Sequence, residues 1–121
     1  MAGRFPLYTD ADIHGPVVDA LIKAGWDVVR AVDRFPEGTD DRIHFEEAVR
    51  QGRVLVANDA HMKATAERWL DQGRSFHGLI WWPRKNYERM TVSDIVGVFD
   101  GLAGLAQPFG GYPIIHVKAP R

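Results

Sequence analysis

The sequence contains no cysteine, which excludes disulfide bonds and thiolate metal sites. It has no apolar run near the ~20 residues of a membrane-spanning helix, and Met1–Pro6 lacks the apolar core of a signal peptide. The formal net charge is only −1, so the chain as a whole does not attract nucleic acid. These absences favour a cytoplasmic protein with no membrane partner, in which any nucleic-acid binding depends on local clusters of charge.

The chain of 121 residues, 45% of them hydrophobic, predicts one globular domain over residues 1–121. Short apolar runs alternate with amphipathic stretches. The runs predict strands over 5–9, 26–32, 53–58, 79–82 and 112–117. The amphipathic stretches predict helices over 16–24, 40–51, 61–72 and 91–103, whereas residues 83–90 are expected to form an irregular loop.

This alternation of strands and helices predicts an α/β fold. The expected architecture is a three-layer α/β/α sandwich with a central, mainly parallel sheet of four or five strands. The continuous apolar run Val54–Ala57 is typical of a strand covered on both faces. In such sheets, ligand sites lie beyond the carboxyl ends of the strands.

Acidic residues occupy the positions that this rule selects. Asp10 and Asp12 follow the first strand, and Asp59 follows the third, with His61 two residues later. Asp40 and Asp41 lie at the start of a helix, and Asp41 is the next candidate if Asp40 only caps that helix. If the first and third strands are neighbours, the carboxylates meet at one edge of the sheet, where they repel one another unless a cation intervenes. Oxygen ligands of this kind suit Mg²⁺ or Mn²⁺.

Each of these residues also has a simpler interpretation. Asp12, Asp40 and Asp59 stand where helix-capping residues are common. A histidine on the first turn of a helix, such as His61, is more often a surface residue than a ligand. The metal hypothesis therefore depends on several acids meeting, and not on any one of them.

Five segments carry a resemblance to a known family. They are LYTDADI (7–13), GWDVV (25–29), TDDRI (39–43), GRVLVANDAHM (52–62) and GLIWWPR (78–84). In this order they resemble the PIN-like nucleases, in particular the small members found beside antitoxin genes and related to VapC-type toxins. The likeness spans about residues 5 to 105, and GRVLV is its most distinctive part.

The resemblance implies a metal-dependent endoribonuclease that is the toxin of a toxin–antitoxin pair. Asp10, Asp40 and Asp59 correspond to the family's catalytic, metal-binding acids, and Asp12 and His61 would complete the metal set. The family usually has Asp at the position of His61 and Asn at that of Asp12, so a changed metal geometry is expected. The implied cofactor is Mg²⁺ or Mn²⁺. The implied partners are RNA, a small cognate antitoxin protein and, as a further possibility, a second copy in a homodimer.

A segment that mixes aromatic and basic residues follows the fourth predicted strand. Arg84 and Lys85 could pair with RNA phosphates, and Trp82 could stack on an unpaired base. The alternative is that the tryptophan faces the core and the two cations are ordinary solvated charges.

Two other functions remain open. A receiver-like phosphoacceptor domain would use Asp10, Asp12 and Asp59, with Lys118 as its late lysine, but it expects a small hydroxyl residue where Trp82 stands. A non-catalytic PIN-like binding module would keep the fold without turnover.

Overall fold

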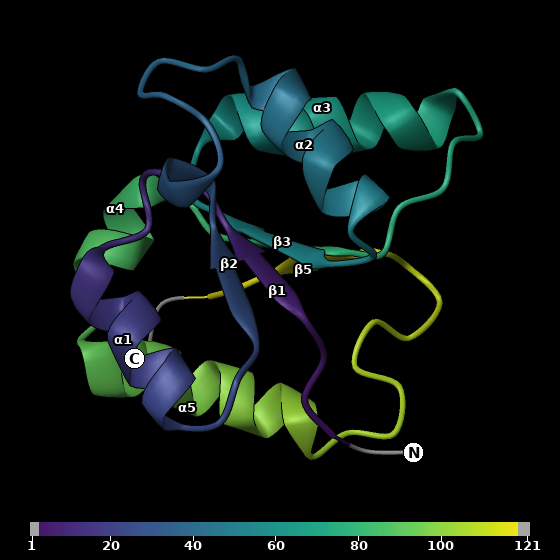
Figure 1. Ribbon diagram of the computed structural model, residues 1–121. Coiled ribbons are helices and arrows are strands. Elements are labelled where there is room, and N and C mark those ends of the chain that lie inside the picture. Colours follow the sequence, from purple (N-terminus) through teal and green to yellow (C-terminus); the bar gives the residue numbers. More distant parts are fainter. Residues whose placement is uncertain (1–2, 119–121) are drawn as a thin grey trace.

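A computed structural model describes residues 3–118 and shows a five-stranded parallel sheet between two layers of helices (Figure 1). The strands are Leu7–Thr9 (β1), Val28–Arg30 (β2), Val54–Ala57 (β3), Leu79–Trp81 (β4) and Ile114–His116 (β5). The helices are Gly15–Lys23 (α1), Asp41–Arg50 (α2), Ala60–Asp71 (α3), Arg84–Glu88 (α4) and Val92–Ala103 (α5), with a 3-10 turn at Ala31–Asp33 (η1). The predicted three-layer α/β/α class is confirmed. Residues 1–2 and 119–121 of the predicted domain lie outside the described part.

The strand order is β2-β1-β3-β4-β5. Leu7 of β1 lies opposite Val28 of β2 on one side and Val54 of β3 on the other, so β1 and β3 are neighbours. The chain leaves β1 toward α1 on one face of the sheet and leaves β3 toward α3 on the other (Figure 1). This divergence opens a crevice beyond the carboxyl ends of β1 and β3, where doubly wound sheets bind ligands.

Alternate residues of the strands pack into two separate cores. Leu7 and Val56 belong to the cluster that includes α1 and α5, whereas Tyr8 and Leu55 belong to the cluster that includes α2 and α3. Coverage on both faces explains the uninterrupted apolar sequence of β3. Truncation of Leu55, which is 1% exposed, to Ala should cost about 2–5 kcal/mol.

The ends of the helices follow their capping residues. The Asp40 side chain accepts a hydrogen bond from the Arg42 N–H at 2.8 Å, and Thr91 and Asp94 form a complete capping box on α5. Gly25 ends the first helical segment with a φ of +98°, a conformation that favours glycine. These local signals placed the four longer helices correctly.

Two segments differ from the prediction. Residues 31–33 form the 3-10 turn η1 and not the end of a strand, and the expected loop 83–90 contains the short helix α4. Tyr87 is its one buried residue, at 2% exposed, and the Tyr87 hydroxyl accepts a hydrogen bond from the His14 N–H at 2.9 Å. A five-residue helix with a single buried residue leaves no apolar period in the sequence.

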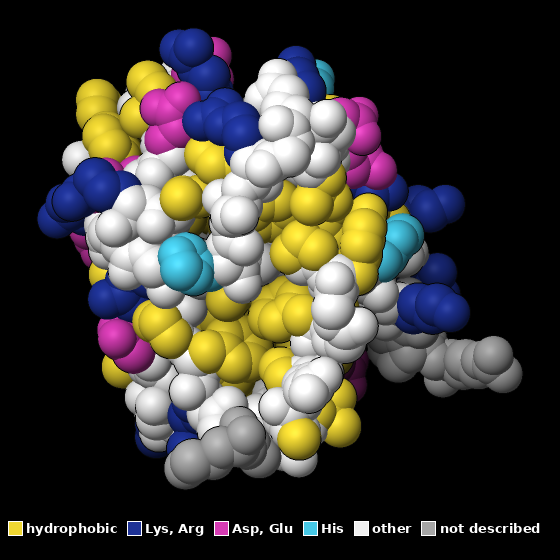
Figure 2. Space-filling model, turned by 90° about the vertical axis from the view of Figure 1, so that its right-hand side faces the viewer, with side chains coloured by type: hydrophobic (Ala, Val, Ile, Leu, Met, Phe, Trp, Pro, Cys, Tyr) yellow, Lys and Arg dark blue, Asp and Glu magenta, His cyan; other side chains and the backbone are white. Residues whose placement is uncertain are grey.

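The end of the sheet at which the strands begin is apolar. On that face, the right-hand side of Figure 1, hydrophobic side chains gather in the middle and charged side chains lie toward the margins (Figure 2). Phe109 closes over Gly78, where an added Cβ would lie 2.6 Å from the Phe109 ring.

None of the helices within residues 3–118 is long and apolar enough to cross a membrane.

Candidate metal centre

Four aspartates and Glu37 line a cleft of about 540 Å³ at the carboxyl end of the sheet. Asp10 follows β1, Asp12 lies two residues later, and Asp59 follows β3. The fourth, Asp41, is the first residue of α2. The sheet topology therefore brings Asp10, Asp12 and Asp59 together, as predicted from their positions after the carboxyl ends of the first and third strands.

Asp10 is the most deeply buried of the four. It is 5% exposed, and its backbone N–H extends the β1–β3 pairing by donating to the Val56 carbonyl at 3.0 Å. Its carboxylate accepts one hydrogen bond, from the Ala11 N–H at 2.9 Å, which lowers the pKa. Burial dominates and raises the pKa of Asp10 to about 6, and repulsion from the other three carboxylates adds to the increase.

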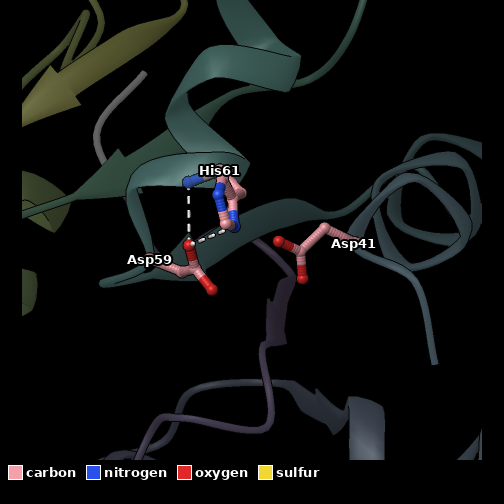
Figure 3. A group of neighbouring side chains, drawn as sticks. All are labelled: Asp41, Asp59 and His61. Atoms are coloured by element: carbon pink, nitrogen blue, oxygen red, sulfur yellow. Dashed lines mark hydrogen bonds and ion pairs between the residues drawn. The ribbon is translucent and has the colours of Figure 1, made fainter. Parts of the chain in front are cut away.

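Asp59, His61 and Asp41 lie together, with the two aspartates lining the cleft and His61 beside it (Figure 3). Asp59 caps α3 by accepting a hydrogen bond from the His61 N–H at 2.7 Å, and the His61 Nδ1 lies 3.5 Å from the same oxygen. Asp41 faces them from α2, and one ligand atom from each of the three residues lies within 4.8 Å of the others. Burial and then the charge of Asp59 raise the pKa of Asp41, while His61 lowers it.

Asp40, which the resemblance placed among the metal acids, does not line this cleft. It is exposed, and its carboxylate is engaged with the Arg42 N–H as the N-cap of α2. The structure places Asp41 there instead, because the first helical residue points in a different direction from the cap. Asp59 is also a helix cap but lines the cleft, so the difference between Asp40 and Asp41 lies in their position and not in the capping hydrogen bond.

Asp12 lies at the rim and has a cationic partner. The Arg84 Nη2 lies 2.6 Å from the Asp12 Oδ2, across the opening between β1 and α4. Arg84, predicted to contact substrate, is therefore near the cleft but paired. Lys85 is exposed on the same helix.

Trp82 cannot serve as a stacking platform in this structure. It is 1% exposed and packs against Tyr87 at 5.2 Å between ring centroids. Trp81 and Trp82 point to opposite faces of the sheet, and both faces are covered by helices, so both rings are buried. The expectation that Trp82 meets an RNA base is corrected accordingly.

A tyrosine and a histidine that the sequence reading did not select lie at the back of the cleft. The Tyr8 hydroxyl is 3.2 Å from the Nδ1 of His44, which lines the cleft. Burial lowers the pKa of His44 and raises the pKa of Tyr8 to about 12, so both are neutral near pH 7. Two features of the sequence could have indicated these residues: His44 lies one turn after Asp40, and Tyr8 lies within the first strand.

Comparison of the chain with protein-family models, curated proteins and solved structures found no match. The site must therefore be interpreted from its own chemistry. Within residues 3–118, no Lys or Arg side chain lies within ion-pair distance of Asp10, Asp41 or Asp59. Asp41, Asp59 and His61 offer ligand atoms close enough together for one ion, and Asp10 lines the same cleft as the two aspartates. Carboxylate and imidazole ligands of this kind fit Mg²⁺ or Mn²⁺.

Proposed function

We propose that the protein is a Mg²⁺- or Mn²⁺-dependent nuclease that hydrolyses RNA phosphodiester bonds, with Asp10, Asp41 and Asp59 as metal ligands. One observation carries the proposal: three carboxylates converge without a cationic side chain, and one of them is buried with a pKa raised to about 6. Such an arrangement opposes folding unless a cation neutralises it.

The chain's own residues suit phosphodiester hydrolysis. When bound, a divalent ion would supply an activated water and stabilise the negative charge that develops on phosphorus. Asp10 and Asp59 follow the paired strands β1 and β3. Asp41 and His61 stand on the first turns of α2 and α3, whose amino ends attract phosphate oxygens. His61, with its side chain 89% exposed, stands beside Asp59 and is available as a further metal ligand.

Metal binding and cleavage should be measured on the same set of variants. Asp10→Asn, Asp41→Asn and Asp59→Asn should each weaken Mn²⁺ binding by roughly tenfold or more in calorimetry and abolish cleavage of a fluorophore-quencher RNA. Asp19→Asn, which removes an exposed acid of α1, is the matched control and should behave as wild type. Unchanged Mn²⁺ affinity in all three cleft variants would refute the metal site.

The proposal extends to a cytoplasmic toxin that a small antitoxin protein neutralises. This part is supported by the sequence resemblance to PIN-like nucleases. Induced expression of the protein should arrest bacterial growth, and Asp10→Asn should relieve the arrest. Equal arrest by both proteins would count against a nuclease toxin.

The strand order favours a receiver-like phosphoacceptor as a second candidate, because receiver sheets share the order β2-β1-β3-β4-β5. Asp59 would then accept a phosphoryl group beside Asp10 and Asp12. The buried Trp82 after β4 and the exposed Lys118 after β5 argue against it. Incubation with acetyl phosphate followed by intact-protein mass spectrometry distinguishes the receiver from the nuclease. A phosphoryl adduct that Asp59→Asn removes would favour the receiver.

Metal binding without RNA cleavage would instead identify a non-catalytic binding module.

A further inference from the structure

Two pockets extend the metal cleft along α3. The first, of about 390 Å³, shares Thr39 and Asp41 with the cleft and reaches Arg68. The second, of about 370 Å³, shares Asp40, Thr65 and Arg68 with the first. Together they make one continuous path from the candidate metal ligands to the carboxyl end of α3.

One face of α3 forms the floor of this path. His61, Thr65, Arg68 and Gln72 line it, and their spacings of four, three and four residues place them on a single side of the helix. At 1.5 Å per residue the stripe is about 16 Å long. The amino end of α2, which crosses α3 on the same layer, supplies the opposite wall (Figure 1).

Arg42, Arg68 and Arg74 line the second pocket, and we call them the arginine groove. All three are exposed, and within residues 3–118 none forms an ion pair with a carboxylate. This differs from Arg34, Arg50, Arg53 and Arg84, each of which pairs with an acid. Asp40 lines the same pocket, so the three guanidinium groups outnumber the carboxylates there, and a bound polyanion would pair with them.

The geometry of the arginine groove suits a phosphate backbone. The Arg74 guanidinium carbon lies 3.6 Å above the centroid of the Trp69 ring, which holds the group in place and leaves its edge N–H groups available. Guanidinium groups bind phosphate oxygens in a bidentate manner. A length of about 16 Å accommodates roughly four or five stacked nucleotides at about 3.4 Å each.

We propose that the arginine groove binds the backbone of a single-stranded RNA whose scissile phosphate lies in the metal cleft. The inference rests on the proposed nuclease function. It adds the path of the RNA, which runs from the metal cleft along α3 toward Arg74. Continuity with the acidic cleft favours RNA over an acidic peptide, because a regular phosphate chain can follow the arginines and still present one phosphate to the metal ligands.

The test is fluorescence anisotropy with a labelled octauridylate in chelator-containing buffer, over a series of salt concentrations. The triple variant Arg42→Ala, Arg68→Ala, Arg74→Ala should bind roughly tenfold more weakly at low salt, and the slope of log affinity against log salt should shrink by about 2, at about 0.7 per lost contact. The control Arg4→Ala, Lys23→Ala, Arg89→Ala removes the same charge from exposed residues that line neither the cleft nor its two extensions. It should bind as wild type.

A second variant guards against loss of folding. Arg42→Glu, Arg68→Glu keeps the Arg74–Trp69 contact, and it should bind RNA more weakly still while retaining the wild-type circular dichroism spectrum. Equal losses in groove and control variants, or no loss in the groove variants, would overturn the proposal. Displacement of the RNA by polyglutamate at an equal charge concentration would also overturn it, in favour of an acidic protein partner.

Mn²⁺ calorimetry separates this proposal from the proposed function. The groove variants should keep the wild-type Mn²⁺ affinity, because none of the three arginines lines the metal cleft. RNA binding by the groove in a protein that neither binds Mn²⁺ nor cleaves RNA would uphold the groove and refute the nuclease. If the protein cleaves RNA but its groove variants bind RNA normally, the nuclease is upheld and the arginine groove is refuted.

Discussion

Asp10 and Glu47 are both buried carboxylates, 5% and 8% exposed, but they lie in opposite electrostatic environments. In the cleft, burial raises the pKa of Asp10 to about 6. On α2, hydrogen bonds from Arg50, and then from Gln51 and Arg34, lower the pKa of Glu47 to about 2 against the opposing effect of burial. Hydrogen-bonding partners therefore decide whether the pKa of a buried acid is lowered, as for Glu47, or raised, as for Asp10.

The difference shows which acid is structural and which is available for chemistry. Glu47 receives side-chain hydrogen bonds from three residues, at 2.6 Å from Arg50, 2.6 Å from Gln51 and 3.1 Å from Arg34. Asp10 receives one backbone hydrogen bond and faces three other carboxylates. A satisfied acid stabilises the fold, whereas an unsatisfied one destabilises it and leaves coordination sites for a cation.

The largest expected effect is on Asp10. Because its folded-state pKa is about 6 and its ordinary pKa 3.8, the folded protein loses stability as pH rises from about 4 to about 6 in the absence of metal. At about 1.36 kcal/mol per unit this amounts to about 3 kcal/mol. Asp10→Asn should be more stable than wild type by up to that amount at pH 7 and equal to it below pH 4, in urea unfolding with a chelator. An identical pH profile for the two proteins would show that Asp10 is not desolvated.

Glu47 should behave in the opposite way. Its lowered pKa means that the ionised form stabilises the fold above its ordinary value of 4.5, and that this stability disappears as pH falls toward 2. Glu47→Gln should cost about 2 kcal/mol at pH 7, and the loss should shrink over that acidic range. Glu46→Gln, at the exposed neighbouring position, is the control and should change stability by less than about 0.5 kcal/mol. Urea unfolding at several pH values measures both.

A smaller effect separates Asp41 from Asp40. Asp41→Asn should raise stability without metal, by less than Asp10→Asn does, because its carboxylate is less buried and its pKa is also raised. Asp40→Asn should change stability by only a few tenths of a kcal/mol, since Asn caps a helix about as well as Asp. Mn²⁺ affinity should fall for Asp41→Asn alone. A loss of affinity in Asp40→Asn would restore the assignment based on the family resemblance.

The smallest stability effect is expected at His61. Its side chain is 89% exposed, so His61→Ala should alter the free energy of unfolding by less than about 0.5 kcal/mol. Nitrogen ligands favour Mn²⁺ over Mg²⁺, and the variant should lose part of that preference in paired calorimetric titrations. An unchanged ratio of the two affinities would place the imidazole outside the metal shell.

Local patterns were sufficient to predict the five strands, the four longer helices and part of the site. Val54–Ala57 is a strand covered on both faces, Asp40 and Thr91 cap helices, and Asp10 and Asp59 follow strands that prove to be neighbours. Each of these features depends on a few consecutive residues, because apolar period and capping chemistry act over one or two turns.

Long-range packing decided the rest. The sheet order set which carboxylates meet, and the direction of α2 brought Asp41 instead of Asp40 to the cleft. Helices on both faces buried Trp82, which sequence alone offered as a base contact. By itself the sequence determined which segments become strands and longer helices, and where acids follow them. Which side chains share a cleft or a groove was decided only by the tertiary structure, because burial and pairing depend on residues far apart in the chain.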